Sequence, residues 1–181
     1  MNTLTARDVA SYIKSKTDVY GETQLQKLVY YAQCWSLAWD GSPLFEDEIQ
    51  AWKNGPVLPA LRHSNTSLSP DAAHLTDERA RATVDAVVDH YARFNGSTLS
   101  ARSHEERPWR EARGTLADGE PSARAIDPQV MRQWANDESL AGHDVPVRRP
   151  VPHRVAERAR VMELGRSGAQ TWARTLEILG R

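Results

Sequence analysis

The residues of this sequence that could carry catalysis or hold a metal ion are few and widely spaced. None of the six histidines has another histidine three or four residues away, the spacing that puts two ligands on one helix face. His104-Glu105 begins like a zinc-protease motif, but the second histidine is missing and Pro108 would break the helix. A metal site would have to be assembled from distant histidines, so we expect no metal and no cofactor.

Nucleophiles and phosphate-binding loops give no better indication of an enzyme. Cys34 could act as a nucleophile with a distant histidine, but it lies within an apolar helical stretch, where a free cysteine usually packs as a small hydrophobe. The acidic cluster Glu46-Asp47-Glu48 could bind Mg²⁺, although a solvated turn explains it more simply. The sequence has no glycine-rich phosphate loop, dinucleotide motif or Gly-x-Ser-x-Gly elbow. We therefore expect a protein that is not an enzyme.

Features typical of binding modules are stronger, because tryptophan is scarce in most proteins and this chain has six. Trp35 and Trp39 lie in an apolar helical stretch, whereas Trp52 and Trp109 stand in proline-flanked, irregular segments. Aromatic and arginine side chains on such segments are typical hot spots of protein interfaces. The alternative is that Trp52 and Trp109 only pin their loops onto the helical core, and the sequence leaves both interpretations open.

One central stretch, residues 24–57, must position many of these side chains, as an apolar helix, a sharp turn and a tryptophan-bearing segment. Thr23 and Gln26 have the spacing of a capping box at the helix start. At 100° per residue, apolar side chains cover about half of the helix circumference, wider than the stripe of a surface helix. The polar side consists of Gln26, Gln33, Ser36 and Asp40. The sequence therefore predicts the central core helix over residues 24–39.

Lys27 interrupts the apolar arc of this helix, since it projects between Cys34 and Ala38 and close to Tyr31. In one interpretation its ammonium group snorkels to solvent over aromatic neighbours. In the other, Lys27 is paired with a carboxylate and fixes the helix against a partner or a second segment. The sequence alone does not decide between the two.

Helix-start patterns elsewhere predict a mainly α-helical domain with a small β-hairpin. Thr5 and Asp8 form a capping box for a first helix that runs to about Lys16. Further helices are predicted from Thr76 to Phe94, over 97–102, over 109–113 and from Asp127-Pro128 onward. In the helix predicted from Thr76 to Phe94, the buried face consists of Ala80, Val84, Val87, Val88 and Tyr91. Residues 49–53 resemble half of a hairpin. Pro56 and Pro59 argue against regular structure until a short helix near residues 60–63. Residues 64–70 are expected to form a loop.

Length and charge suggest one domain with a basic extension. The chain has 181 residues, of which 40% are hydrophobic and 26% charged, as in soluble globular proteins. There is no apolar run of membrane-spanning length, no signal sequence and a single cysteine, so we expect a cytoplasmic location and no membrane contact. Residues 1–140 have a net charge of −5 and residues 141–181 of +4. We expect a compact helical domain at 1–140, a Pro- and Arg-rich linker at 141–152 and a basic amphipathic helical extension at 153–181.

Four sequence blocks, in a fixed order, carry a resemblance to a known domain. They are residues 25–33 (LQKLVYYAQ), 43–45 (PLF), 51–57 (AWKNGPV) and 103–113 (SHEERPWREAR). Together they resemble the Panacea domain, the SocA-like antitoxin family, in which the last block has the pattern Thr-His-x-x-x-Pro-Trp. Asn54 stands where that family often has an aromatic residue, and Ser103 replaces the threonine.

This resemblance covers roughly residues 5–138 and implies a mainly helical domain with a small β element. Family members neutralise a toxin by direct protein contact, and some deliver the toxin to a cytoplasmic protease. The resemblance implies signature positions at Lys27, Tyr31, Trp52, Gly55, Pro56, His104, Pro108 and Trp109. Asn54 and Arg113, in the same blocks, are further candidates for partner binding. The basic tail adds candidate contacts at Arg148, Arg149, Trp172 and Leu176.

We therefore expect an antitoxin of a bacterial or phage toxin–antitoxin system. It would bind its cognate toxin, encoded next to it, and cover the active site or substrate surface. The alternative is a proteolytic adaptor that hands the toxin to a cytoplasmic protease. The amphipathic last helix leaves a homodimer open. Direct contact with nucleic acid is not expected, because the body is acidic and no helix-turn-helix stands out.

Overall fold

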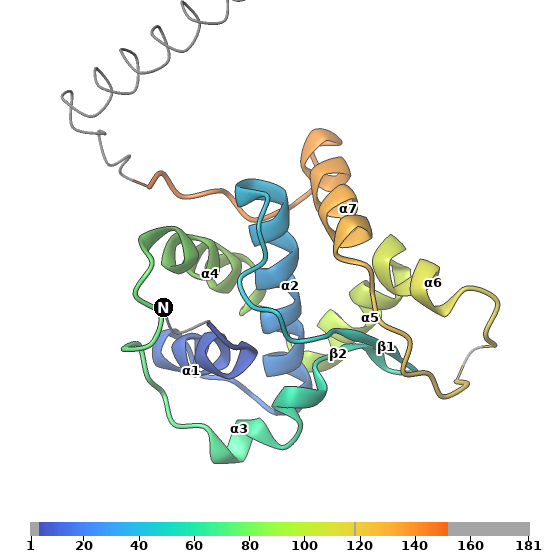
Figure 1. Ribbon diagram of the computed structural model, residues 1–181, viewed down its shortest axis with the longest axis horizontal. Helices are drawn as coiled ribbons and strands as arrows, with labels where there is room; N and C mark the ends of the chain where they lie inside the picture. Colours follow the sequence, from blue (N-terminus) through green and yellow to red (C-terminus); the bar gives the residue numbers. More distant parts are fainter. Residues whose placement is uncertain (1–3, 118, 152–181) are drawn as a thin grey trace, which may run out of the picture. The chain divides into compact units, whose positions relative to one another are not determined.

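The structure, a computed structural model, describes residues 4–117 and 119–151, and the chain divides into two units, residues 1–150 and 151–181. The first unit is mainly α-helical with one two-stranded antiparallel hairpin, as predicted (Figure 1). Its elements are α1 (Ala6–Lys16), α2 (Glu22–Asp40), β1 (Gln50–Trp52), β2 (Gly55–Val57), a 3-10 turn (Pro59–Leu61), α3 (Ser64–Ser67), α4 (Glu78–Tyr91), α5 (Gly96–Glu105), α6 (Arg107–Arg113) and α7 (Pro128–Leu140). The predicted extension at 153–181, with Trp172 and Leu176, lies outside the described residues.

The start of α1 is closed by the predicted capping box. The Asp8 amide donates to Thr5 Oγ1 at 3.3 Å, and Asp8 Oδ2 accepts from the Thr5 amide at 2.9 Å. Two of the amides that a helix start leaves without a partner are thereby satisfied. Val9 and Ile13, one turn apart, are fully buried against the rest of the core.

The central helix is α2, which packs against α1, α4, α5 and α7 (Figure 1). All residues from 24 to 37 are buried, so the polar side of the helix is covered as well as its apolar arc. Gln26 exchanges hydrogen bonds with the backbone of Leu58, at 2.8 Å to its amide and 3.2 Å to its carbonyl. Gln33 does the same with the Leu44 amide at 2.8 Å and the Phe45 carbonyl at 3.0 Å. Each amide uses both its donor and its acceptor, and this offsets the cost of burying it.

The predicted capping box at Thr23 and Gln26 is wrong. Gly21 is the N-cap of α2, and no side chain caps the helix, because the Gln26 amide is already bonded to Leu58. The other end agrees with the predicted turn. Gly41 closes α2 in the left-handed conformation, at φ +69°, which costs glycine no steric clash.

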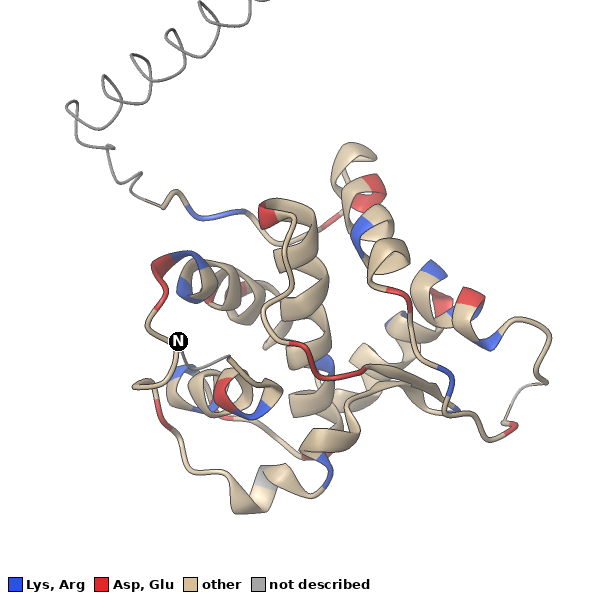
Figure 2. Ribbon diagram, in the orientation of Figure 1, with Lys and Arg blue, Asp and Glu red and all other residues tan. Residues whose placement is uncertain are grey.

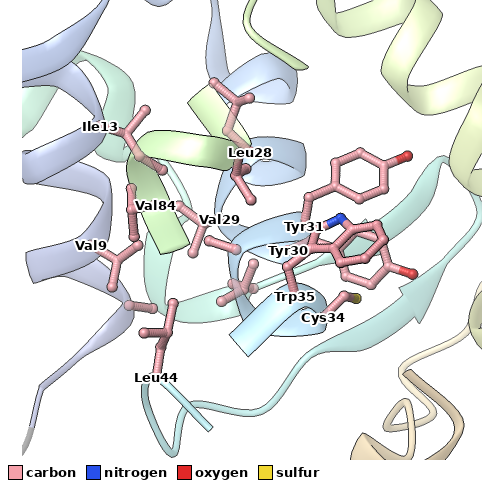
Figure 3. Packing of buried hydrophobic residues seen from close by; sticks show 14 of the residues in the cluster. Val9, Ile13, Leu28, Val29, Tyr30, Tyr31, Cys34, Trp35, Leu44 and Val84 are labelled. Carbon is pink, nitrogen blue, oxygen red and sulfur yellow. The ribbon is translucent and has the colours of Figure 1, made fainter. Parts of the chain in front are cut away.

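The core has an aliphatic part and an aromatic part on different sides of α2 (Figure 3). Val9, Ile13 and Val84 pack toward α1 and α4, whereas tyrosine and tryptophan side chains fill the space toward α7. Tyr31 stacks on Tyr91 with ring centroids 4.0 Å apart and planes 4° from parallel. Both are large aromatic rings removed from water, so this stack is a substantial part of the burial that stabilises the fold.

The apolar rhythm of α4 is confirmed, because every residue of its predicted buried face is buried. The cap is Asp77, whose carboxylate accepts from the Arg79 amide at 3.1 Å, and not Thr76. Asn95, expected to end this helix, instead caps the next one by accepting from the Thr98 amide at 2.9 Å. As a result α5 runs from Gly96 to Glu105 and extends beyond both ends of the predicted helix over 97–102.

The outer edge of β1 is covered by a segment from later in the chain. Gln50 pairs with Val57 in β2 and bridges to Ala125 on the other side, and the Ala51 amide donates to the Arg124 carbonyl at 2.8 Å. Since Ala51 directs its N–H away from β2, its partner Pro56 sits where no ladder hydrogen bond is needed. A proline is therefore tolerated in β2, and the prediction of an irregular segment at Pro56 is wrong. The expected loop at 64–70 is also wrong in part, since α3 occupies its first residues.

Residues 144–150, which we name the strap, have no regular secondary structure and contact the C-terminal end of α2 and the outer face of α4. Arg148 Nη2 donates to Asp40 Oδ1 at 2.6 Å. Arg149 pairs with Asp85 at 3.3 Å and with Asp89. Figure 2 shows this basic stretch in blue beside the C-terminal end of α2. Asp85 and Asp89, on the outer face of α4, are therefore partners of the strap.

Candidate functional site

Lys27 holds the hairpin against α2. Its side chain is 1% exposed, and Nζ donates to the Asn54 carbonyl at 3.2 Å and the Pro56 carbonyl at 2.8 Å. Burial lowers the pKa of Lys27 to about 7, against the opposing effect of the Glu106 charge. Snorkelling to solvent is thus wrong. Lys27 fixes a second segment, as the other interpretation states, but its acceptors are backbone carbonyls and not a carboxylate.

Gly55 is the residue that lets Lys27 come so close to the hairpin. A Cβ atom at this position would lie 2.6 Å from Lys27 Nζ and 2.8 Å from Ser103 Oγ. The backbone has φ +102°, which residues with a side chain rarely adopt. Position 55 therefore requires glycine for two separate reasons, space and conformation.

Trp109 fixes the hairpin from α6. Its indole Nε1 donates to the Trp52 carbonyl at 2.8 Å. The His104 ring lies 4.4 Å from the Trp109 ring, and the Arg113 guanidinium lies over Trp109 at 5.0 Å. Arg113 is buried and donates to two carbonyls of the loop after α6. These contacts agree with the alternative in which Trp109 pins its segment onto the helical core.

The hairpin tip, Lys53 and Asn54, is exposed. Next to it, the half-buried Trp52 ring has the Arg62 guanidinium over it at 5.6 Å. A shallow, largely apolar depression of about 440 Å³ adjoins the tip and is lined by Trp52, Lys53, Pro121, Ser122 and Ala123. An exposed basic tip beside a half-exposed tryptophan and an arginine has the composition of a protein-contact surface.

Tyr31 does not belong to the hairpin group. Its hydroxyl donates to Glu106 Oε1 at 2.6 Å, and the Tyr30 hydroxyl donates to Glu106 Oε2 at 3.2 Å. Desolvation raises the pKa of Glu106 to about 7, although both tyrosine hydrogen bonds and the charge of Arg102 favour the ionised form. Sequence reasoning missed Glu106. The one indication in the sequence was that Glu106 lies between His104 and Pro108, two residues that the resemblance marks as signature positions.

Burial keeps the Cys34 thiol neutral. The pKa of Cys34 is raised well above its ordinary value, first by desolvation and then by the Glu106 charge. A thiol that does not ionise near neutral pH is a poor nucleophile, which agrees with its assignment to the core. Among the described residues there is no cluster of histidine, cysteine and acidic side chains that could hold a metal ion. In the same part of the chain, no helix is both long and apolar enough to cross a membrane.

The predicted site residues thus fall into separate places. Those that meet around the hairpin are Lys27, Trp52, Asn54, Gly55, Pro56, His104, Trp109 and Arg113. Tyr31 lies at Glu106, and Arg148 and Arg149 lie on the strap. Within the first group, only Trp52, Asn54 and the partly exposed His104 and Trp109 reach the surface. The sequence motif therefore mostly builds a support for the tip.

A helical domain organised on one buried helix, with a small hairpin clamped by a buried lysine, is the class of fold that these contacts define. Residues 25–110 match the family model of the antitoxin SocA-like Panacea domain, which agrees with the resemblance seen in the sequence. Searches of curated proteins and of solved structures found no match. The matched segment begins within α2, contains the hairpin, α3, α4 and α5, and ends within α6. The match suggests a general role in a toxin–antitoxin system.

Proposed function

We propose that this protein is an antitoxin that neutralises its cognate protein toxin by direct binding and covers the toxin's active site or substrate surface. The observation that carries the proposal is the hairpin tip, which is exposed while the residues beneath it are buried and fixed. A tip already ordered by Lys27 and Trp109 loses little conformational freedom when a partner binds. The matched Panacea domain supports a toxin as that partner.

The test is co-expression of this chain with the product of the neighbouring gene, followed by co-purification and a growth assay. Lys53→Glu together with Asn54→Arg changes the tip and leaves the buried clamp intact, and should weaken binding about tenfold or more. Arg132→Glu, an exposed charge change on α7, is the matched control and should leave binding unchanged.

The amount of toxin protein is measured in the same cells. Under occlusion it stays constant while growth is restored. If growth returns because the toxin disappears, and only when a cytoplasmic protease is present, the chain acts as an adaptor and the occlusion proposal fails.

We also propose that the domain is 1–140 with a linker at 141–152, and that the extension at 153–181 adds contacts to the partner. Two truncations separate the extension from the strap. Deletion of residues 151–181 leaves the ion pairs of Arg148 and Arg149 in place, whereas deletion of 145–181 removes them. A loss of toxin binding already in the shorter deletion supports contacts by the extension, including Trp172 and Leu176. Full neutralisation by that variant removes its role.

A further inference from the structure

A pocket of about 360 Å³ lies between α5, α6, α7 and the strap. Its lining consists of Tyr91, Arg102, Glu105, Glu106, Arg107, Trp134, Glu138, Asp144 and Val145. This volume is at the lower end of the roughly 300–1,000 Å³ typical of small-ligand sites. The hairpin residues do not line it, and the proposed toxin contact makes no use of it.

The carboxylate of Glu106 has hydrogen bonds but no ion pair in this pocket, although the charge of Arg102 acts on it from a longer distance. Its partners are the hydroxyls of Tyr30 and Tyr31, which are neutral donors. Within the described part of the chain, no lysine, arginine or histidine forms an ion pair with it. A desolvated carboxylate in this state is costly, and a cation brought next to it would remove much of that cost.

The two arginines of the pocket are engaged elsewhere. Arg107 pairs with Glu111 at 2.6 Å and with Asp137 at 3.7 Å. The Arg102 guanidinium lies over the Phe94 ring at 4.7 Å and forms no ion pair in the described structure. The acidic lining residues Glu105, Glu106, Glu138 and Asp144 outnumber them. The net field inside the pocket therefore favours a positive charge, even though Asp144 is itself paired with Arg93 at 2.6 Å and Glu138 contacts His143 Nδ1 at 2.8 Å.

Aromatic side chains form part of the wall beside Glu106. Tyr91 and Trp134 both line the pocket, and both pack on Tyr31, at centroid distances of 4.0 and 6.2 Å. Packing from behind holds these rings in place. Aromatic faces attract cations, and a planar guanidinium can stack on them while it donates to a carboxylate.

We infer that this pocket is a binding site for one alkylguanidinium or alkylammonium group, held by the Glu106 carboxylate and the rings of Tyr91 and Trp134. Such a group is supplied by an arginine or lysine side chain of a bound protein or by a free amine. The inference does not depend on the identity of the toxin, and it goes beyond the contact proposed for the hairpin tip.

The probe is n-butylguanidinium, titrated into the full chain and followed by the NMR signals of the tryptophan indoles, with inorganic phosphate and n-butylurea as controls. The cation should shift the Trp134 signal saturably, and the other two probes should not. Glu106→Gln keeps the shape and one of the two oxygen acceptors used by the tyrosine hydroxyls but removes the charge, and should weaken the probe about ten- to hundredfold. Unchanged melting of this variant at low pH would show that it folds.

Arg102→Gln provides a test in the opposite direction. It removes a repelling charge at the pocket, so the probe should bind about two- to fourfold more tightly at about pH 8. If the pocket instead holds anions, this variant loses affinity for phosphate, and that result overturns the inference. The absence of any probe binding by the wild-type chain also overturns it, including the case in which Arg102 swings in to fill the pocket.

The pH dependence gives an independent readout. Affinity for the probe should rise between about pH 6 and 8 as Glu106 ionises, and should be flat in Glu106→Gln. The other titratable or charged groups that face this carboxylate are Tyr30 and Tyr31 of α2, Tyr91 of α4, Arg102 and Glu105 of α5, Arg107 of α6, Glu138 of α7 and Asp144 of the strap, with Lys27 acting at longer range. An affinity without pH dependence would mean that Glu106 does not hold the cation.

A competition experiment identifies the source of the group. If saturating n-butylguanidinium displaces a co-purified protein partner, that partner supplies a basic side chain to the pocket. If the partner stays bound while the probe occupies the pocket, the site serves a free amine. If the wild-type chain fails to co-purify with a partner even in the absence of the probe, that result contradicts the proposed antitoxin function and does not bear on the pocket.

Discussion

Gly55 is the position at which one added methyl group would disturb the most. Gly55→Ala places a Cβ atom 2.6 Å from Lys27 Nζ and forces alanine to φ +102°. We expect a loss of more than about 2 kcal/mol in the free energy of unfolding, measured by urea denaturation. Gly41→Ala is the matched control, since it has φ +69° with nothing within 4 Å of the added Cβ, and should cost only about 1–2 kcal/mol. Equal costs would contradict the close contact with Lys27.

Glu106 should make the protein less stable as the pH rises toward neutrality. Its pKa in the folded chain is about 7 against an ordinary 4.5, so the folded state binds more protons than the unfolded state between these values. Stability therefore falls across this window, by up to about 3 kcal/mol, and is unaffected below it. Thermal melting from about pH 4 to 8 measures the fall. Glu106→Gln should lack it, and an identical pH profile in this variant would refute the assignment.

Lys27 should have the opposite effect at higher pH. Its pKa is lowered from 10.5 to about 7, so the unfolded state binds more protons between these values and stability rises with pH. Lys27→Met keeps the apolar stem but removes the ammonium donor, which leaves the Pro56 carbonyl without it and the Asn54 carbonyl with Ser100 Oγ alone. We expect a loss of about 1–3 kcal/mol and a flatter profile above pH 7 in urea denaturation. A variant as stable as the wild type would mean that the clamp contributes nothing.

At the scale of elements, the hairpin depends on three helices that come from different parts of the chain. Lys27 comes from α2, Ser103 from α5 and Trp109 from α6. Two strands of three residues are too short to be stable alone, so these contacts stabilise the hairpin and fix its tip. The family motif is thus spread along the sequence because its members must reach one small element from several sides.

The strap is the element whose attachment should depend most on salt. Its arginines are about half exposed, at 50% for Arg148 and 45% for Arg149, so each ion pair contributes little and is screened. Asp40→Asn combined with Asp89→Asn should speed trypsin cleavage of the Arg148–Arg149 bond, and high salt should do the same to the wild type. Glu78→Gln, an exposed acid at the start of α4, is the control and should not change the rate. Equal cleavage in all variants would mean that the ion pairs do not hold the strap.

At the scale of the whole molecule, the described unit is built around a helix that touches solvent only near its ends. A helix so completely covered needs partners for every polar side chain, and α2 finds them in connecting segments far along the sequence. The hairpin, the segments before and after it and the loop after α5 are consequently all fixed relative to α2. A partner that binds the tip therefore meets a surface set by the core.

The helices α1, α2, α4 and α7 could be predicted from the sequence, because caps and apolar periodicity are local. The Thr5 and Asp127 caps and the buried face of α4 depend on residues within a few positions of one another. The hairpin site could be predicted as a set of residue positions from the family motif. Whether those residues touch a partner or support the fold was not contained in the motif.

Tertiary structure alone decided what the polar residues of the interior do. Gln26 looked like a cap and is bonded to Leu58, thirty-two residues away, while Lys27 is bonded to the carbonyls of Asn54 and Pro56. Glu106 acquires its raised pKa only when α2, α4 and α7 close around it. Local pattern determines which face of a helix is apolar. The charge state and role of a buried polar group depend on its desolvation and on partners distant in the chain, and those exist only after the helices have packed.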